Sequence, residues 1–376
     1  MREGLEVQRQ SSEIVIVGGG IIGCATAYEL ARRGTTVTLI ERGPIGREAS
    51  WASAGIISLP NRPNMRPERV EISRRSLKRY PGLVEEIEER TGISVEYRRP
   101  GEIIVAVDDV HATEERARAE WQRSQGFAIE ELDLQSARSR EPALPPDLRA
   151  AWYIPGVGSL SLYRLTQALA MAASALGATI LAETPVAAIE QRERTVTGVR
   201  LADRTISADI VILATGAWTR LLGDTVGVHL PTKPVKGQLV AFRSPLGPKH
   251  VLAGHGGYAR PRVDGTTIVA ATEEDAGFDR RVTGDGVAWL LELTRTICPS
   301  LLAGELVESW TGLRPGTDGG EPLIGPVPGV EGLWVAAGHF RTGAKEGPAT
   351  AELVATSIVS GRVDPLLAPF SPRGEV

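Results

Sequence analysis

The chain has 376 residues, more than one ordinary hydrophobic core accommodates, so its length indicates two lobes. Hydrophobic residues make up 42% and charged residues 23%, as in soluble globular proteins. The formal net charge of -4 is spread over both signs, which argues against a partner such as nucleic acid or an anionic membrane surface.

The N-terminal region predicts neither export nor a membrane anchor. Residues 1–13 carry no apolar signal-peptide core, and the apolar region 14–31 is interrupted by four glycines and Glu29. Cys24 and Cys298 are the two cysteines, and a free buried thiol is expected at Cys24 rather than a disulfide. We therefore expect a cytoplasmic protein without a membrane span.

The first predicted unit is a strand, a glycine turn and a helix. A strand over 13–17 leads into Gly18-x-Gly20-x-x-Gly23, a helix runs to about residue 33, and a second strand covers 36–41. Such a turn lets the backbone approach a pyrophosphate at a helix N-terminus. Glu41 ends the second strand, where an acid binds a ribose and disfavours NADP. The alternative is a structural turn with a surface glutamate.

The later elements suggest a discontinuous architecture. We expect an α/β fold in which 10–91, 151–234 and 303–365 build a Rossmann-like nucleotide-binding domain. The inserts 92–150 and 235–302 build a mainly antiparallel β substrate domain, and 1–9 and 366–376 are tails. The predicted helices cover 162–176, 282–296 and residue 343 to about 361, and the predicted strands are 179–181, 186–190, 196–201, 210–214, 237–242, 258–263, 266–272, 309–313 and 333–337.

Residues 48–55, Glu-Ala-Ser-Trp-Ala-Ser-Ala-Gly, form a run of small and hydroxyl side chains at a predicted helix start. Such residues suit close packing against a phosphate and a ring system, but a tight helix N-terminus explains them equally well.

Several ordered motifs together resemble the glycine oxidase branch of the D-amino acid oxidase superfamily, which includes sarcosine oxidase and D-amino acid dehydrogenase. The resemblance covers nearly the whole chain. It rests on residues 15–23, 48–55, 212–218, 312–317 and 338–343. It implies FAD as the cofactor, with the backbone of Val186 at the adenine end.

The resemblance and the motif positions together predict the residues that bind FAD. These are Gly18, Gly20, Ile22, Gly23, Glu41, Arg42, Ser50, Ala52, Ser53, Ala54, Gly55, Val186, Thr215, Gly216, Trp218, Gly338, His339, Arg341, Thr342 and Gly343. The FAD is expected to be non-covalent, because covalent members of the superfamily use a cysteine near the position of Arg314, and Cys24 and Cys298 lie elsewhere.

Arg314 is the first candidate for contact with substrate. A carboxylate prefers a bidentate guanidinium, and Arg314 follows the apolar strand 309–313 directly before Pro315, so we expect it to point out of a sheet into a cleft. In similar glycine oxidases the matching arginine binds the substrate carboxylate, supported by a tyrosine that matches Tyr258. The alternatives are a structural salt bridge for Arg314 and a half-buried strand position for Tyr258.

The turn at residues 338–343 supplies the other candidates. In similar oxidases it lines the flavin, so Arg341 is a second cation near the site, and His339 invites a less favoured general-base interpretation. The helix from Gly343 would place its positive end near the flavin pyrimidine ring. Residues 342–347 depart from the family pattern, and Lys345 is either a flavin-edge cation or a solvated neighbour of Glu346.

The favoured function is an FAD-dependent oxidase of small amino acids such as glycine, sarcosine and D-alanine. Hydride transfer to flavin N5 would be followed by reoxidation with O2, giving an imine and H2O2. The alternatives are a D-amino acid dehydrogenase that reduces a quinone and an FAD-binding subunit of a larger complex. Zinc-type Cys/His spacing, a P-loop and a G-x-S-x-G elbow are absent from the sequence, so no metal site is expected. The sequence leaves open whether the protein forms a homo-oligomer.

Overall fold

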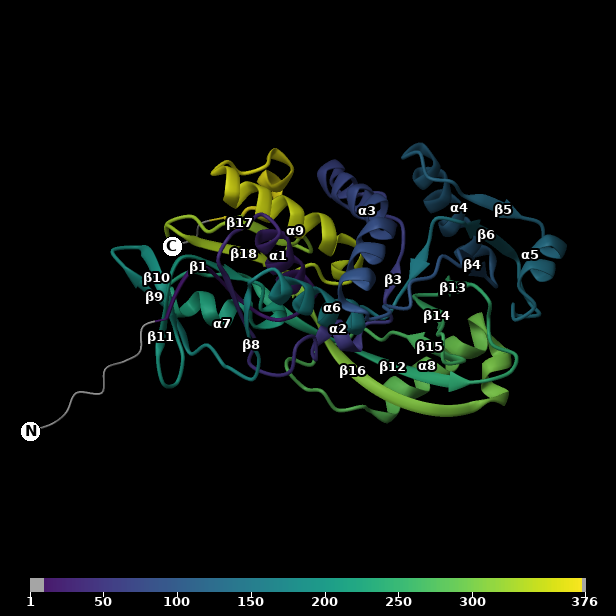
Figure 1. The fold of residues 1–376 in the computed structure, drawn as a ribbon. Helices are drawn as coiled ribbons and strands as arrows, with labels where there is room; N and C mark the ends of the chain where they lie inside the picture. Colours follow the sequence, from purple (N-terminus) through teal and green to yellow (C-terminus); the bar gives the residue numbers. More distant parts are fainter. Residues whose placement is uncertain (1–9, 374–376) are drawn as a thin grey trace, which may run out of the picture.

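The computed structural model describes residues 10–373 and contains two large sheets in two lobes, with helices packed against both (Figure 1). The predicted N-terminal tail, 1–9, and the last three residues lie outside the described residues. Within 10–373, none of the helices combines the length and the apolar character that crossing a bilayer requires.

The first sheet has a parallel centre, as the βαβ pattern predicted. Along it, β1 pairs in parallel with β2 and β11, β2 with β8, and β11 with β18. On the two sides of β1, β2 and residues 211–213 at the end of β11 are buried, as in sheets covered on two faces. The strand order is β17 (Leu323–Pro326), β18 (Leu333–Ala337), β11 (Thr205–Leu213), β1 (Gln10–Val17), β2 (Val37–Ile40) and β8 (Thr179–Leu181), with β10 (Thr195–Arg200) and β9 (Ala188–Arg192) attached to β11.

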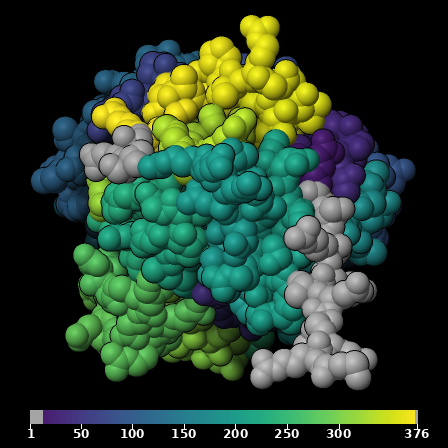
Figure 2. Space-filling view, turned by 90° about the vertical axis from the view of Figure 1, so that its left-hand side faces the viewer, coloured from purple at the N-terminus to yellow at the C-terminus, as the bar shows by residue number. Residues whose placement is uncertain are grey.

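Helices from distant parts of the chain cover one face of this sheet. They share one core cluster and are α1 (Ile21–Ala31), α3 (Pro67–Thr91), α6 (Leu162–Ala175) and α9 (Gly343–Ser360). The short α7 (Thr219–Gly223) follows β11, and Val226, Val228 and Leu230 close the opposite face. Figure 2 shows how early, middle and late segments meet side by side at one end of this lobe.

The second sheet is mainly antiparallel, with one parallel pair between β4 and β13. Its order is β16 (Glu305–Thr317), β12 (Thr232–Arg243), β15 (Thr266–Ala270), β14 (Gly257–Pro261), β13 (Val251–Gly254), β4 (Glu102–Ala106), β6 (Ala150–Ile154) and β5 (Glu130–Leu132). The helices of this lobe are α4 (Asp109–Ser124), α5 (Leu134–Arg140) and α8 (Gly284–Ile297).

Short elements join the lobes. β3 (Ile56–Ile57) pairs with β7 (Gly158–Ser159), and the one-turn α2 (Ala49–Ala52) lies on β16, where the Trp310 indole donates a 3.1 Å hydrogen bond to the carbonyl of Ala52. The 3-10 turns are η1 (Gly216–Trp218), η2 (Asp224–Val226), η3 (Pro299–Ala303) and η4 (Pro365–Phe370).

The predicted division into domains differs from the division between the sheets at three places. β6 and β16 begin near the predicted boundaries at 150 and 302, but both are strands of the second sheet. The predicted C-terminal tail contains most of η4, whose Leu367 and Phe370 are buried in the core of the first lobe. The assignment of functions to the segments stays a prediction.

Candidate active site

A cavity of about 630 Å³ is lined by residues of both lobes. At one end it reaches the glycine turn after β1 and Val186, and at the other it is bounded by strands of the second sheet. Its shape therefore brings the predicted nucleotide turn and the predicted substrate residues into one continuous space.

The three glycines of the turn serve different purposes. Gly18 has φ +113°, and a Cβ there would run into the carbonyl of Ala214. A Cβ on Gly23 would overlap the carbonyl oxygen of Gly18, so this glycine permits close packing of α1 on β1. A Cβ on Gly20 would meet Ser50 Oγ at 3.5 Å, an ordinary contact. Of the three, Gly18 and Gly20 line the cavity and Gly23 does not.

Polar side chains hold the turn against its neighbours. Ser50 Oγ accepts a 3.0 Å hydrogen bond from the N–H of Ile21 at the start of α1. Glu41 accepts from Gly19 N–H at 2.7 Å and from Gly43 N–H at 3.1 Å, so its carboxylate fixes the turn as well as lining the cavity. Each carboxylate oxygen keeps a further lone pair for a ligand hydroxyl.

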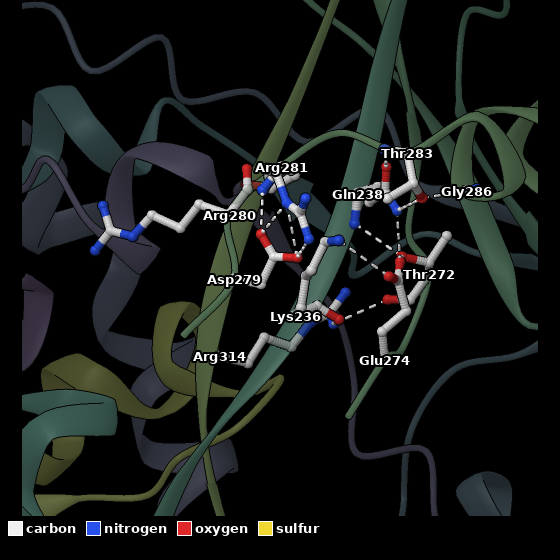
Figure 3. A network of polar contacts seen from close by, with 11 residues as sticks. Lys236, Gln238, Thr272, Glu274, Asp279, Arg280, Arg281, Thr283, Gly286 and Arg314 are labelled. Atoms are coloured by element: carbon white, nitrogen blue, oxygen red, sulfur yellow. Dashed lines mark hydrogen bonds and ion pairs between the residues drawn. The ribbon is translucent and has the colours of Figure 1, made fainter. Parts of the chain in front are cut away.

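Arg314 lines the cavity from β16, and its guanidinium crosses Gly237 of the neighbouring strand. Nη1 donates to the carbonyls of Thr272 at 3.0 Å and Lys236 at 3.4 Å (Figure 3). A Cβ on Gly237 would lie 2.5 Å from this guanidinium, so the glycine makes room for it. Burial lowers the pKa of Arg314, but a guanidinium remains protonated at neutral pH.

The residues around Arg314 leave its guanidinium without a directly paired carboxylate. Lys236 Nζ pairs with Glu274 at 3.2 Å, and Thr272 Oγ1 also donates to Glu274 (Figure 3). Within residues 10–373, no carboxylate oxygen lies within 4.0 Å of the Arg314 guanidinium, although Glu273 and Glu274 are near enough to oppose the lowering of its pKa. The buried Lys236, by contrast, has Glu274 as its partner. The structural salt bridge considered as the alternative for Arg314 is thus absent from the described part of the chain.

The predicted strand end at Arg314 was wrong. β16 continues through Pro315 to Thr317, and Arg314 lies opposite Val235 of β12. β16 is at the edge of its sheet, where a proline removes no hydrogen bond that a second neighbour needs. The side chain reaches the cavity by lying across Gly237 rather than by projecting from a strand end.

Tyr258 and Arg341 also line the cavity. Burial raises the pKa of Tyr258, and the positive charges of Arg314 and Arg341 oppose that shift, so the hydroxyl stays protonated at neutral pH. Arg341 forms an ion pair with Glu273, and both side chains are nearly half exposed. Its charge is already compensated, in contrast to that of Arg314.

His339 lines the cavity but is buried to 1% exposure. Burial lowers its pKa to about 4, so the imidazole is neutral at neutral pH and a weak base. Nε2 lies 3.1 Å from Thr350 Oγ1, and within the described residues Nδ1 has no hydrogen-bond partner. These features favour a packing role over the general-base interpretation.

Most of the predicted FAD-binding residues line the cavity, and three do not. Gly23 permits close packing of α1 on the turn, and Gly338, with φ +78°, lies against Thr317. The Thr342 hydroxyl donates a hydrogen bond to the carbonyl of His339. The predicted residues that line the cavity are Gly18, Gly20, Ile22, Glu41, Arg42, Ser50, Ala52, Ser53, Ala54, Gly55, Val186, Thr215, Gly216, Trp218, His339, Arg341 and Gly343.

The solvated interpretation of Lys345 was wrong. Lys345 is 3% and Glu346 1% exposed, and Lys345 Nζ donates to the carbonyl of Leu59 at 3.2 Å. Glu346 pairs with Arg69 of α3 at 3.2 Å and accepts from Ser73. The residues that depart from the family pattern therefore form a buried polar contact between α9 and α3. This contact could not be predicted, because α3 is far from α9 in the sequence.

Sequence reasoning missed the part of the lining that comes from residues 58–122. Here the cavity is bounded by β4, by α4 and by the loop after β3. These segments have no motif, and their proximity to the site depends on the pairing of β4 with β13. The lining residues concerned are Ser58, Leu59, Asn61, Glu102, Ile104, Glu115, Arg118 and Gln122.

Comparison with known proteins gives a consistent result over the whole fold. A family described as FAD dependent oxidoreductase matches residues 13–357. The glycine oxidase of Pseudomonas putida is 36% identical over 372 residues, which cover 97% of this chain and 100% of that protein.

Solved structures include similar proteins with the same architecture. The glycine oxidase from Geobacillus kaustophilus is 34% identical, has a TM-score of 0.92, and the match covers 98% of this chain and 100% of that chain. The iminodiacetate oxidase from Chelativorans sp. BNC1 is 27% identical, with a TM-score of 0.86 over 96% of this chain and 98% of that chain.

Proposed function

Because the chain belongs to the FAD-dependent oxidoreductase family, we propose that it oxidises small amino acids at the α-carbon. Glycine, sarcosine and D-alanine are the proposed substrates, and O2 is the proposed electron acceptor. The names of the similar glycine oxidases support this choice. The observation that carries the proposal is Arg314, a cation without an anionic partner that lines the same cavity as the dinucleotide turn.

The residues of the first lobe fit FAD. Gly20 lines the cavity without a side chain, the turn leads into the N-terminus of α1, and the Glu41 carboxylate, which also lines the cavity, could accept from a ribose hydroxyl. A glycine-lined end and an end bounded by strands of the second sheet suit a dinucleotide with a flavin ring. Bound FAD would accept a hydride from the substrate and pass the electron pair to O2.

Arg314 is proposed to hold the substrate carboxylate, with Tyr258 as a second donor. Two guanidinium N–H groups fit a carboxylate bidentately, and the protonated Tyr258 hydroxyl donates a hydrogen bond. Fixing the carboxylate sets the α-carbon in one place, which is the main requirement for transfer of a hydride. The carbonyls of Thr272 and Lys236 orient the guanidinium from behind.

The chemistry balances without a protein base at the α-carbon. The amino acid loses a hydride from Cα and a proton from its neutral nitrogen, which leaves an imine. O2 takes up the two electrons and two protons to give H2O2, and water hydrolyses the imine to the oxo acid and ammonia, or methylamine from sarcosine. The low pKa of His339 suits a site in which no strong base is needed.

FAD is proposed to be held without a covalent bond. Cys24 and Cys298 are both buried, neither lines the cavity, and burial raises the pKa of each thiol, so neither is a reactive thiolate. Acid precipitation should release the yellow colour into the supernatant. Colour that stays in the washed pellet would contradict the proposal.

The test of the proposed activity is peroxide production by the purified protein loaded with FAD, with O2 as the sole acceptor. Glycine, sarcosine and D-alanine should give peroxide and the matching oxo acid, and should outperform D-phenylalanine and L-alanine. Reduction of a quinone without peroxide would favour a D-amino acid dehydrogenase. No turnover with either acceptor would favour a subunit that acts within a larger complex.

A further inference from the structure

The cavity extends beyond Arg314 and Tyr258 to a polar end that the proposed oxidation of glycine does not use. This end, here called the Glu102 end, is formed by Glu102 of β4 and by Glu115, Arg118 and Gln122 of α4. The three α4 residues are spaced by three and four positions, so they share one face of the helix.

Glu102 is a buried carboxyl group that faces the cavity without a partner. Its residue is 8% exposed, and within residues 10–373 its side chain forms neither a hydrogen bond nor an ion pair. Burial raises the pKa of Glu102 to about 7, against the opposing effect of Arg118. Leaving a buried carboxylate unpaired is costly, so a group that pairs with it would be bound favourably.

The polar neighbours of Glu102 are already engaged with other groups. Arg118 forms an ion pair with Glu115, and Gln122 Nε2 donates to the carbonyl of Pro60 at 2.7 Å. Lys345 is close enough to affect the pKa of Glu102, but its ammonium donates to Leu59 and does not line the cavity. Glu102 is thus the member of this group that remains free to receive a ligand.

The sheet register places Glu102 within reach of a molecule held at the other end. Tyr258 lies opposite Ala253 of β13, and Ala253 lies opposite Ile104 of β4. Glu102 is two residues from Ile104 and on the same face of the strand. The Cα atoms of Tyr258 and Glu102 are therefore two strand spacings apart across the sheet and two residues apart along the strand. Together these offsets correspond to roughly 12 Å. Both residues line the cavity, and a hydrogen bond of about 2.8 Å at each end of a ligand accounts for part of this distance.

We propose that Glu102 receives a second cation of the substrate, a primary ammonium group carried beyond the α-carbon or on the amine nitrogen. The inference rests on the proposed function and adds a substrate class to it: amino acids whose carboxylate pairs with Arg314 and whose distal ammonium pairs with Glu102. Glycine and sarcosine fill the first position alone.

The test uses a pair of N-substituted glycines of equal shape. N-(2-aminoethyl)glycine carries the distal ammonium, and N-propylglycine has a methyl group in its place. Binding is measured by calorimetry on the FAD-loaded protein, and turnover by peroxide release. Wild type should prefer the ammonium compound by at least roughly 30-fold in Kd and in kcat/KM, the lower end of the effect expected for a desolvated charge pair.

Glu102→Gln keeps the shape and removes the charge, and Glu114→Gln on the exposed side of α4 is the matched control. Glu102→Gln should abolish the preference while leaving the kcat/KM for sarcosine within twofold of wild type. It should also unfold at the same or a higher temperature, because an unpaired buried charge has been removed. Glu114→Gln should retain the preference.

Three results would overturn the inference. Equal binding of the two glycines by wild type would show that Glu102 recognises no cation. Tighter binding of iminodiacetate than of N-(2-aminoethyl)glycine would assign this end to an anion. A loss of sarcosine turnover in Glu102→Gln, with a shifted pH profile, would make Glu102 a proton-transfer group. Since the calorimetric comparison needs no turnover, failure of the oxidase proposal would leave this test decisive.

Discussion

The two ends of the cavity are built in different ways. The nucleotide end comes mainly from the turn that begins at Gly18 and from Glu41, which are close in sequence as well as in space, with Val186 added from a distant segment. The substrate end comes from β16, β14 and β4, which meet through strand pairing. The first end is therefore specified locally and tolerates few substitutions, whereas the second depends on side chains that can be exchanged on a stable sheet.

The largest expected effect is at Gly23. Gly23→Ala places a Cβ on the carbonyl oxygen of Gly18, and the backbone must move, at a cost of about 3 kcal/mol. This variant should fail to accumulate as folded protein. Gly20→Ala is the matched control, because its Cβ meets only an ordinary contact: it should fold normally yet bind FAD at least about tenfold more weakly. Equal behaviour of the two variants would refute the different roles of these glycines.

His339 should make the fold sensitive to acid. Its folded pKa of about 4 lies below the ordinary value of 6.5, so the unfolded chain binds the proton more tightly. The stability contribution is present above pH 6.5 and is lost as the pH falls toward 4, by about 2 kcal/mol between pH 7 and pH 5. Urea unfolding of wild type and His339→Gln at the two pH values measures this, and the variant should lack that part of the loss.

Gly237 tests how Arg314 reaches the cavity. Gly237→Ala should leave the fold intact, because the contact it creates is with the movable end of a side chain, but it should push the guanidinium off its carbonyl acceptors. The KM for glycine should rise about tenfold, or about 1.4 kcal/mol. In an Arg314→Ala background the same substitution should add nothing, and an additive effect would show that the two residues act independently.

The smallest effect is expected at Arg341. Its ion pair with Glu273 joins two side chains that are 44% and 46% exposed, and such pairs contribute at most about 1 kcal/mol. Arg341→Ala should change the unfolding temperature little and kcat/KM by less than about fivefold. A loss as large as that of Arg314→Ala would mean that Arg341 leaves Glu273 and contacts the substrate.

The same contrast explains how much could be predicted from the sequence. The strands 179–181 and 333–337 were found with the predicted bounds, because short runs of strand-favouring residues between turn residues identify strands whether these are buried, as β18 is, or half-exposed, as β8 is. The glycine turn was found from a similar local pattern, whereas Arg314 was predicted through the resemblance of residues 312–317, and the strand end expected beside it was wrong. The burial of Lys345 and Glu346 was not predicted, because their partners come from α3 and from the loop after β3, which are far away in the sequence.

Glu102 shows the limit most clearly. Nothing around it in the sequence distinguishes it from a surface glutamate at the start of a strand. Glu102 becomes a site residue because β4 pairs with β13, and β13 pairs with β14, the strand of Tyr258. Residues of α4 line the same end of the cavity. Pairing between segments about 150 residues apart has no local signature in a single sequence.

The most direct test of the account is to mix the FAD-loaded protein with glycine in the absence of O2 and to measure the loss of the absorbance of oxidised flavin. Wild type should bleach with saturable dependence on glycine. Arg314→Ala should retain its FAD and need roughly 30- to 5,000-fold more glycine, as expected when a desolvated charge pair worth about 2–5 kcal/mol loses one partner. Bleaching of the variant at wild-type glycine concentrations, or no bleaching of wild type by any small amino acid, would contradict the account.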